Sequence, residues 1–96
     1  MNKTSILDLL NRHRDDIKQR FAVKRLALFG SAARDEMRQE SDIDVLVDFT
    51  EKADLFDFVG LALFLEEKLH RRVDVVPSDT IRGETRNTVM KDAIYI

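Results

Sequence analysis

The sequence predicts an α/β (α+β) fold in which a small mixed sheet is flanked by helices. Two short runs of branched and aromatic residues, Lys24 to Phe29 and Ile43 to Phe49, are typical of strands. A third run, Arg72 to Val76, is stopped by Pro77 and is also typical of a short strand. Segments with apolar residues at helical spacing lie before the first strand and between the second and the third.

An amphipathic helix packed on the sheet is predicted for the N-terminal segment. Thr4 and Ser5 are candidate caps for its start. The apolar residues behind them recur at helical spacing, at Ile6, Leu7, Leu10, Ile17 and Phe21.

A second helix is predicted from Asp54 through His70, where the basic run that follows is typical of a helix end. Its apolar residues cover more of its girth than one sheet face needs. The helix is therefore either buried on two sides or offers its second side to another protein, and we favour the partner surface. One stripe consists of Leu55, Phe58, Val59, Ala62, Leu65 and Leu69, and it is widened by Phe56, Leu61, Leu63 and Phe64.

The C-terminal stretch from Thr80 predicts a helix around Glu84 to Asp92 and then a short strand, Ala93 to Ile96. This last helix is the one that would bury the second side of the Asp54 helix if no partner does.

Two aspartates alternate with aliphatic residues at the start of the second strand. Because side chains on a strand alternate between its faces, Asp42 and Asp44 are expected on one side, with Ile43, Val45 and Val47 facing the core. Two carboxylates one pleat apart repel each other unless a cation lies between them. Mg²⁺ is the expected cation, since it takes oxygen ligands and is usually held by one or two carboxylates plus substrate phosphates.

A Gly-Ser pair ends the first strand and leads into SAARDEMRQ, a stretch of good helix formers. Gly30 is expected at the turn, where it permits a positive φ and a close approach of the backbone to a ligand. Ser31 is expected at the helix N-terminus, which favours an anion. The pair therefore predicts a phosphate cradle.

The third strand supplies another carboxylate, Asp74, which faces opposite to Val73 and Val75. If this strand lies beside the second, three carboxylates converge on one face. Three such groups can hold two metal ions that clamp the attacking and leaving oxygens of an in-line nucleotidyl displacement.

These residues carry a resemblance to a known family. Gly30 and Ser31, ten intervening residues, and then Asp42 and Asp44 resemble the motif of the DNA polymerase β-like nucleotidyltransferase superfamily. The resemblance covers nearly the whole chain, since Asp74 falls where that family places its third carboxylate and the ending VMKDAIYI is also similar.

Within the superfamily, Arg34, Glu36 and the run SDIDVLV resemble the minimal nucleotidyltransferases (MNT), the antitoxin partners of HEPN-domain proteins. Asp35 departs from the family pattern, in which many relatives have glycine at this place, and the departure bears on the shape of the helical turn.

The resemblance implies a Mg²⁺-dependent enzyme that transfers AMP from ATP to a hydroxyl, expected to be that of a tyrosine, on a HEPN toxin. Such a toxin is expected to be a ribonuclease that the modification neutralises. Two Mg²⁺ ions are expected on Asp42, Asp44 and Asp74, which would be both the catalytic and the metal-binding residues. Asp74 would also help to deprotonate the acceptor hydroxyl.

The nucleotide-binding residues implied by the resemblance are Gly30, Ser31 and Arg34. Gly30 and Ser31 would hold the β- and γ-phosphates of ATP. Arg34, one turn into the helix after the cradle, would neutralise the departing pyrophosphate or would be a solvated helix arginine.

Two other functions remain open. The first alternative is a non-catalytic antitoxin that binds its HEPN partner through the apolar helix. The second is a transferase that acts on a small molecule of the antibiotic type. Residues 1–96, 11.2 kDa, are expected to form one minimal nucleotidyltransferase domain without a separate acceptor-binding domain, which disfavours the small-molecule substrate.

Composition narrows the partners further. The net charge is −2, with 16 basic residues scattered among 18 acidic ones, so direct nucleic acid binding is not expected. The absence of cysteine fits a reducing cytoplasm. The longest apolar run, FVGLALFL, is too short to cross a bilayer, so a cytoplasmic protein without a membrane association is expected.

Overall fold

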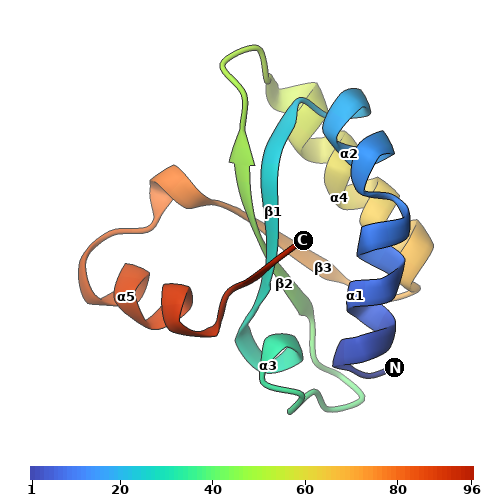
Figure 1. The fold of residues 1–96 in the computed structure, drawn as a ribbon, viewed down its shortest axis with the longest axis vertical. Helices are drawn as coiled ribbons and strands as arrows, with labels where there is room; N and C mark the ends of the chain where they lie inside the picture. The colour runs from blue at the N-terminus through green and yellow to red at the C-terminus, as the bar shows by residue number, and fades with distance from the viewer.

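A computed structural model describes all 96 residues of the chain. The strands form one sheet, with helices on both of its sides (Figure 1). In chain order the elements are α1 (Lys3–Arg12), α2 (Arg14–Arg20), β1 (Val23–Phe29), α3 (Gly30–Ala33), β2 (Ile43–Phe49), α4 (Leu55–Leu69), β3 (Val73–Pro77), the short 3-10 helix η1 (Ser78–Thr80), α5 (Gly83–Asp92) and β4 (Ile94–Tyr95).

The sheet is mixed, as predicted, and its strand order is β3-β2-β1-β4. Strand β1 pairs antiparallel with both β2 and β4, whereas β2 pairs parallel with β3. A parallel pair needs a long crossover connection, and α4 supplies it. The two acid-bearing strands are therefore direct neighbours.

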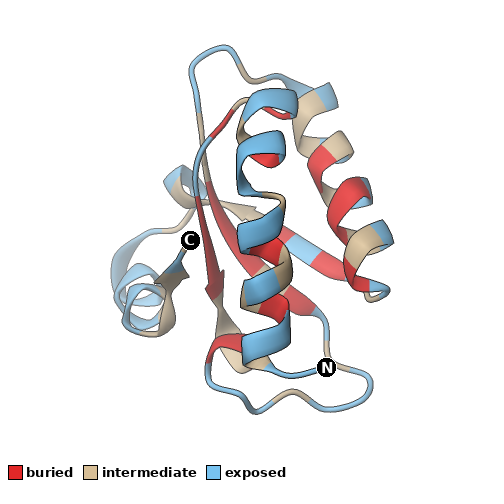
Figure 2. Ribbon diagram, turned by 45° about the vertical axis from the view of Figure 1, so that its right-hand side comes forward, coloured by how far each residue is buried: buried red, intermediate tan, exposed pale blue.

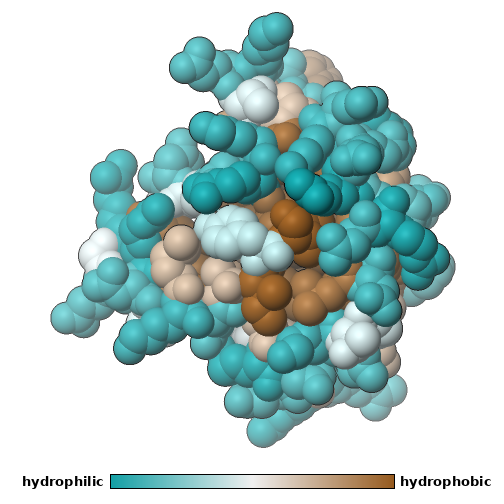
Figure 3. Space-filling model, viewed as in Figure 1, coloured by the Kyte–Doolittle hydropathy of each residue, from teal (hydrophilic) through white to brown (hydrophobic).

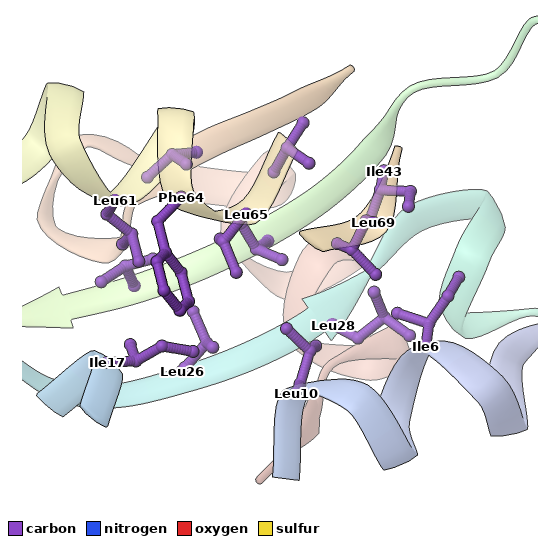
Figure 4. Close-up of a cluster of buried hydrophobic side chains, with 14 of the residues drawn as sticks. Ile6, Leu10, Ile17, Leu26, Leu28, Ile43, Leu61, Phe64, Leu65 and Leu69 are labelled. Carbon is purple, nitrogen blue, oxygen red and sulfur yellow. The ribbon is translucent and has the colours of Figure 1, made fainter. Parts of the chain in front are cut away.

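The core lies between one face of the sheet and helices α1, α2 and α4 (Figure 2). The predicted alternation along β2 is confirmed, because Ile43, Val45 and Val47 are completely buried. Helix α1 contributes Ile6 and Leu10 to the same layer (Figure 4). Burial of apolar surface of this kind is the main source of folding free energy.

The opposite face of the sheet is covered in part by α5, which contacts β1 (Figure 1). Ala27 and Leu46 are buried on this face, between its polar ends. In the space-filling view, apolar side chains gather around the C-terminal end of the chain and polar groups surround them (Figure 3). The guanidinium carbon of Arg25 lies over the Tyr95 ring there, 5.0 Å from the ring centroid.

The N-terminal segment differs from the single helix predicted. Asn2, rather than Thr4 or Ser5, caps α1, and it forms a capping box in which the Ser5 side chain bonds the Asn2 backbone. The helix breaks at His13, whose ring meets Phe64 edge-on at 5.6 Å. A second short helix, α2, follows the break.

Helix α4 has the predicted bounds, with Asp54 as its cap and His70 ending it in the left-handed region. The predicted apolar stripe is wrong in part, because the helix is rotated so that Leu61 and Phe64 are buried, with the Phe64 ring beside that of Phe21. Buried residues of α4 are Leu61, Phe64, Leu65 and Leu69, whereas Leu55, Phe56, Val59 and Leu63 are 73%, 86%, 46% and 62% exposed.

We call the four exposed residues Leu55, Phe56, Val59 and Leu63 the exposed apolar face of α4. Helix α5 does not cover it, since α5 packs on the other side of the sheet (Figure 1). None of the helices combines the length and the apolar character that a membrane-spanning helix requires.

The rotation of α4 makes a testable difference between two leucines two positions apart. Leu65→Ala should lower the free energy of unfolding by about 2–5 kcal/mol, because it leaves a cavity in a fully buried layer. Leu63→Ala, at an exposed position, should change it by less than about 0.5 kcal/mol. Urea unfolding followed by circular dichroism measures both, and equal losses would contradict this orientation of the helix.

Candidate active site

Two of the predicted carboxylates lie side by side on neighbouring strands. In the parallel register of β2 and β3, Asp44 is the direct partner of Asp74. Both side chains point away from the core, since the flanking Val45 and Val75 are buried on the other face. Asp44 is half-buried and Asp74 is exposed.

Asp42 lies just before β2 begins and is exposed. Burial raises the pKa of Asp44, and repulsion from the carboxylates of Asp74 and Asp42 raises it further, while the positive charge of Arg34 opposes these effects. Asp44 therefore lies within the electrostatic reach of the other two predicted carboxylates and of Arg34. No three Asp, Glu, His or Cys side chains of the chain lie where they alone could hold one metal ion.

Gly30 brings the backbone against the Asp44 carboxylate. The residue before it, Phe29, is the register partner of Asp44 across β1 and β2. Gly30 has φ +69°, and a Cβ at this position would overlap the Oδ2 atom of Asp44 and lie 3.3 Å from its Cγ. The turn therefore requires glycine for two reasons, the positive φ and the close approach.

The helix after Gly30 is much shorter than the predicted stretch through Gln39, because α3 ends at Ala33. The Glu36 N–H donates to the Ser31 carbonyl at 2.8 Å, and the Asp35 N–H donates to the Ala32 carbonyl at 3.2 Å. This pair of bonds is a Schellman motif, which stops a helix with one residue in the left-handed region.

Asp35 is that left-handed residue, with φ 57°. Glycine is the usual residue at this place, which gives a physical reason for the glycine of many relatives. The Asp35 carboxylate also accepts a hydrogen bond from the Lys3 backbone N–H at 3.0 Å, at the start of α1. This contact is possible only with a side chain present.

Arg34 follows α3 directly and bonds two carboxylates. Its Nη1 lies 2.6 Å from Asp92 Oδ2, and its Nε lies 3.4 Å from Glu36 Oε2. The hydrogen bond to Asp92 foremost, and then that to Glu36, raises the pKa of Arg34. Arg34 is nevertheless exposed, so the choice between a pyrophosphate contact and a solvated arginine stays a prediction.

Asp92 had no role in the sequence-based prediction beyond ending a helix. It lies 58 residues from Arg34, so no local spacing connects the two. Arg71 is a second such residue, because its Nη2 donates to the carbonyls of Arg38, Gln39 and Ser41 at 2.8, 2.7 and 3.1 Å. These bonds hold the loop that leads into Asp42.

A surface hollow of about 650 Å³ lies at the other end of β2. None of the predicted site residues lines it. Asp48 does, and it is neutralised there by Arg25 at 2.7 Å and bonded by the Ser78 hydroxyl. This hollow is therefore separate from the acidic pair of Asp44 and Asp74.

The donor atoms around the acidic pair are all oxygens, which suits a hard cation such as Mg²⁺. Mg²⁺ is commonly bound by only one or two carboxylates together with substrate phosphates. Neighbouring Asp44 and Asp74 fit that mode, because their mutual repulsion is relieved by a cation between them.

A mixed sheet that presents acids of two neighbouring strands beside a glycine turn defines a nucleotidyl-transferring class of protein. Residues 10–96 match the family model described as "Nucleotidyltransferase domain". The chain belongs to this nucleotidyltransferase family, and the resemblance seen in its motifs is confirmed.

Similar proteins agree with this assignment. The protein adenylyltransferase MntA of Thermococcus cleftensis is 35% identical over 91 residues, which cover 95% of this chain and 92% of that protein. A solved structure assigned as a minimal nucleotidyltransferase is 35% identical, covers 98% of this chain and 95% of its own, and superimposes with a TM-score of 0.79. The predicted fold is thereby confirmed.

Two further solved structures are toxin-antitoxin complexes, each 26% identical in the matched chain. One contains AMP-PNP, with a TM-score of 0.69 over 99% of this chain and 72% of that one. The other holds a tri-AMPylated Shewanella oneidensis HEPN toxin with its MNT antitoxin, with a TM-score of 0.60 over 98% of this chain and 67% of that one.

Proposed function

We propose that this protein transfers AMP from ATP to a tyrosine hydroxyl of a HEPN-domain toxin and so acts as its antitoxin. The observation that carries the proposal is the pairing of Asp44 with Asp74 directly beside Gly30. The similarity to MntA and to complexes with AMP-PNP and with an AMPylated toxin supports the same reaction.

We assign metal binding to Asp42, Asp44 and Asp74, with two Mg²⁺ ions as the expected number. The ions would supply neutralisation of charge on the phosphates and on the attacking and leaving oxygens. Asp44 lies closest to Gly30, and Asp74 lies beside it at the open edge of the acidic face. Asp42 approaches from the loop that Arg71 holds.

Gly30 and Ser31 are assigned to the β- and γ-phosphates of ATP. The tyrosine oxygen attacks the α-phosphorus, and the bond from this phosphorus to the bridging oxygen of the β-phosphate breaks. Pyrophosphate leaves toward Arg34, and the hydroxyl proton passes to the exposed carboxylate of Asp74. Positioning and charge neutralisation supply most of the rate enhancement of such a transfer.

We further propose that the 96 residues act as one catalytic unit whose acceptor-binding surface is supplied by the toxin itself. Because the proposed reaction uses ATP, we expect the protein to act in the cytoplasm. Neither nucleic acid nor a membrane has a role in it.

Incubation with labelled ATP, Mg²⁺ and the purified HEPN partner tests the proposal. Label should appear on the toxin at a tyrosine, with the release of pyrophosphate, and toxin activity should fall as label accumulates. Omission of Mg²⁺ should prevent both. Absence of label from the toxin in the complete mixture would refute the proposed transfer.

A second candidate function is neutralisation of the toxin by binding alone. The exposed apolar face of α4 favours it, since four large apolar side chains on one helix are rarely left in water without a partner. Inhibition that is stoichiometric and needs neither ATP nor the acidic residues would support binding over catalysis.

The role of this face in contacting the toxin can be measured directly. Phe56→Glu should weaken toxin binding at least tenfold, because it places a charge at the centre of an apolar contact, while AMP-PNP binding stays unchanged. Asn87→Glu, at another exposed position, on α5, should leave both affinities as they are. Unaltered toxin binding by the Phe56 variant would exclude the face from the complex.

A further inference from the structure

We infer that Asp92 is a positioning residue that holds the Arg34 guanidinium where it meets the departing pyrophosphate, an assignment that rests on the proposed function. The direct contact is the pair of Arg34 Nη1 with Asp92 Oδ2 at 2.6 Å. Asp92 is the less exposed partner, at 25% against 44% for Arg34.

Asp92 is well placed to hold another side chain, because its own backbone is fixed on both sides. It ends α5, and the next residue, Ala93, donates its N–H to the Val89 carbonyl at 3.1 Å. Strand β4 follows at once and pairs with β1, with Ile94 opposite Leu28. The carboxylate is thereby anchored to the same strand that ends at the glycine turn.

The backbone of Arg34 lies next to Gly30, the glycine of the predicted phosphate cradle. Its N–H donates to the Gly30 carbonyl at 3.2 Å, and Gly30 in turn lies against the Asp44 carboxylate. A long arginine side chain in this place samples many rotamers unless something holds it, and each ordered rotamer costs free energy. The Asp92 carboxylate removes that freedom before the nucleotide arrives.

The pairing leaves donors for a phosphate. A guanidinium has five N–H groups in a fixed plane, and the two bonds in the structure use one on Nη1 and one on Nε. Both N–H groups of Nη2 remain free for an anionic oxygen. Asp92 thus holds Nη1 of Arg34 while Nη2 stays available.

A mutant cycle on nucleotide affinity tests the role of Asp92. We would measure AMP-PNP binding with Mg²⁺ by calorimetry for the wild type, Asp92→Asn, Arg34→Ala and the double variant. Each single variant should bind about tenfold more weakly, the effect of losing one charged hydrogen bond. The double variant should bind no more weakly than Arg34→Ala alone, because Asp92 acts through Arg34.

Controls separate positioning from a general loss of structure. Asp92→Glu keeps the charge and should restore most of the affinity, whereas Asp79→Asn, on the exposed η1, should have no effect. Thermal unfolding of each variant reports on its fold independently of the nucleotide.

Three results would overturn the assignment. Effects of the single variants that multiply in the double variant would mean that Asp92 acts independently of Arg34. Tighter AMP-PNP binding by Asp92→Asn would mean that Asp92 competes with the phosphate. If the wild type binds no AMP-PNP, both the role of Asp92 and the proposed function are overturned. If it binds AMP-PNP but does not transfer AMP to the toxin, only the proposed function is refuted.

Discussion

Asp44→Asn is expected to reduce AMP transfer by at least about a hundredfold and yet to stabilise the fold. Loss of one carboxylate from the acidic pair removes charge stabilisation worth several kcal/mol in a metal-assisted transfer. The gain in stability has a separate cause, because burial and the carboxylates of Asp74 and Asp42 already disfavour the ionised form of Asp44. A neutral amide of similar shape relieves that repulsion.

The gain should depend on pH. The pKa of Asp44 is raised in the folded chain, so the folded protein binds a proton here more readily than the unfolded chain does. The stability that this proton contributes is complete below the unfolded pKa and is lost as the pH rises through the higher folded pKa. Asparagine cannot ionise, so its advantage over the wild type should appear as the pH rises through that value and persist at neutral pH.

Thermal unfolding across the acidic and neutral range, together with the rate of toxin labelling, measures the two effects. Asp48→Asn is the matched control, because Asp48 lies on the same strand and face but pairs with Arg25. It should lose its ion pair without losing transfer. A variant at Asp44 that still labels the toxin at the wild-type rate would remove this residue from the site.

Gly30→Ala is expected to impair nucleotide binding and activity at least tenfold and to lower stability. A left-handed conformation costs a residue with a Cβ about 1–2 kcal/mol, and Gly30 has φ +69°. The new methyl group would also overlap the Asp44 carboxylate, which must then move away from its place beside Asp74. Backbone strain and displacement of a carboxylate therefore act together.

Gly83→Ala separates these two contributions. Gly83 also has a positive φ, 64°, but nothing lies within 4 Å of the place its Cβ would take. It should show the backbone cost alone, with AMP-PNP affinity unchanged. If the two alanine variants lose equal stability and neither loses affinity, the contact between Gly30 and Asp44 has no functional weight.

The features that the sequence predicted correctly are those that depend on residues close together in the chain. The alternation of acids with aliphatics along β2, the glycine directly after β1 and the crossover helix α4 follow from patterns within short segments. The strand order and the parallel register do not, since they depend on pairings between distant segments.

The sequence-based errors have physical causes of the same kind. Helix α3 is short because Asp35 adopts a left-handed conformation. Aspartate can adopt this conformation, but its presence in a sequence does not predict it. The orientation of α4 includes a contact of Phe64 with Phe21, a residue distant in sequence that the helical periodicity of α4 does not contain. Asp92 and Arg71 reach the site from segments far along the chain, so only the folded structure connects them with Arg34 and Asp42.

The parallel pairing of β2 with β3 has a consequence for the moment at which the protein becomes active. A slip of one residue would turn Asp74 inward and Val73 outward, so the acidic pair exists only in the native register. During synthesis Asp44 emerges well before Asp74, with the whole crossover between them. If Asp44 and Asp74 act together as we propose, a nascent or partly folded chain is catalytically silent, and competence arrives only with the final alignment of the edge strand.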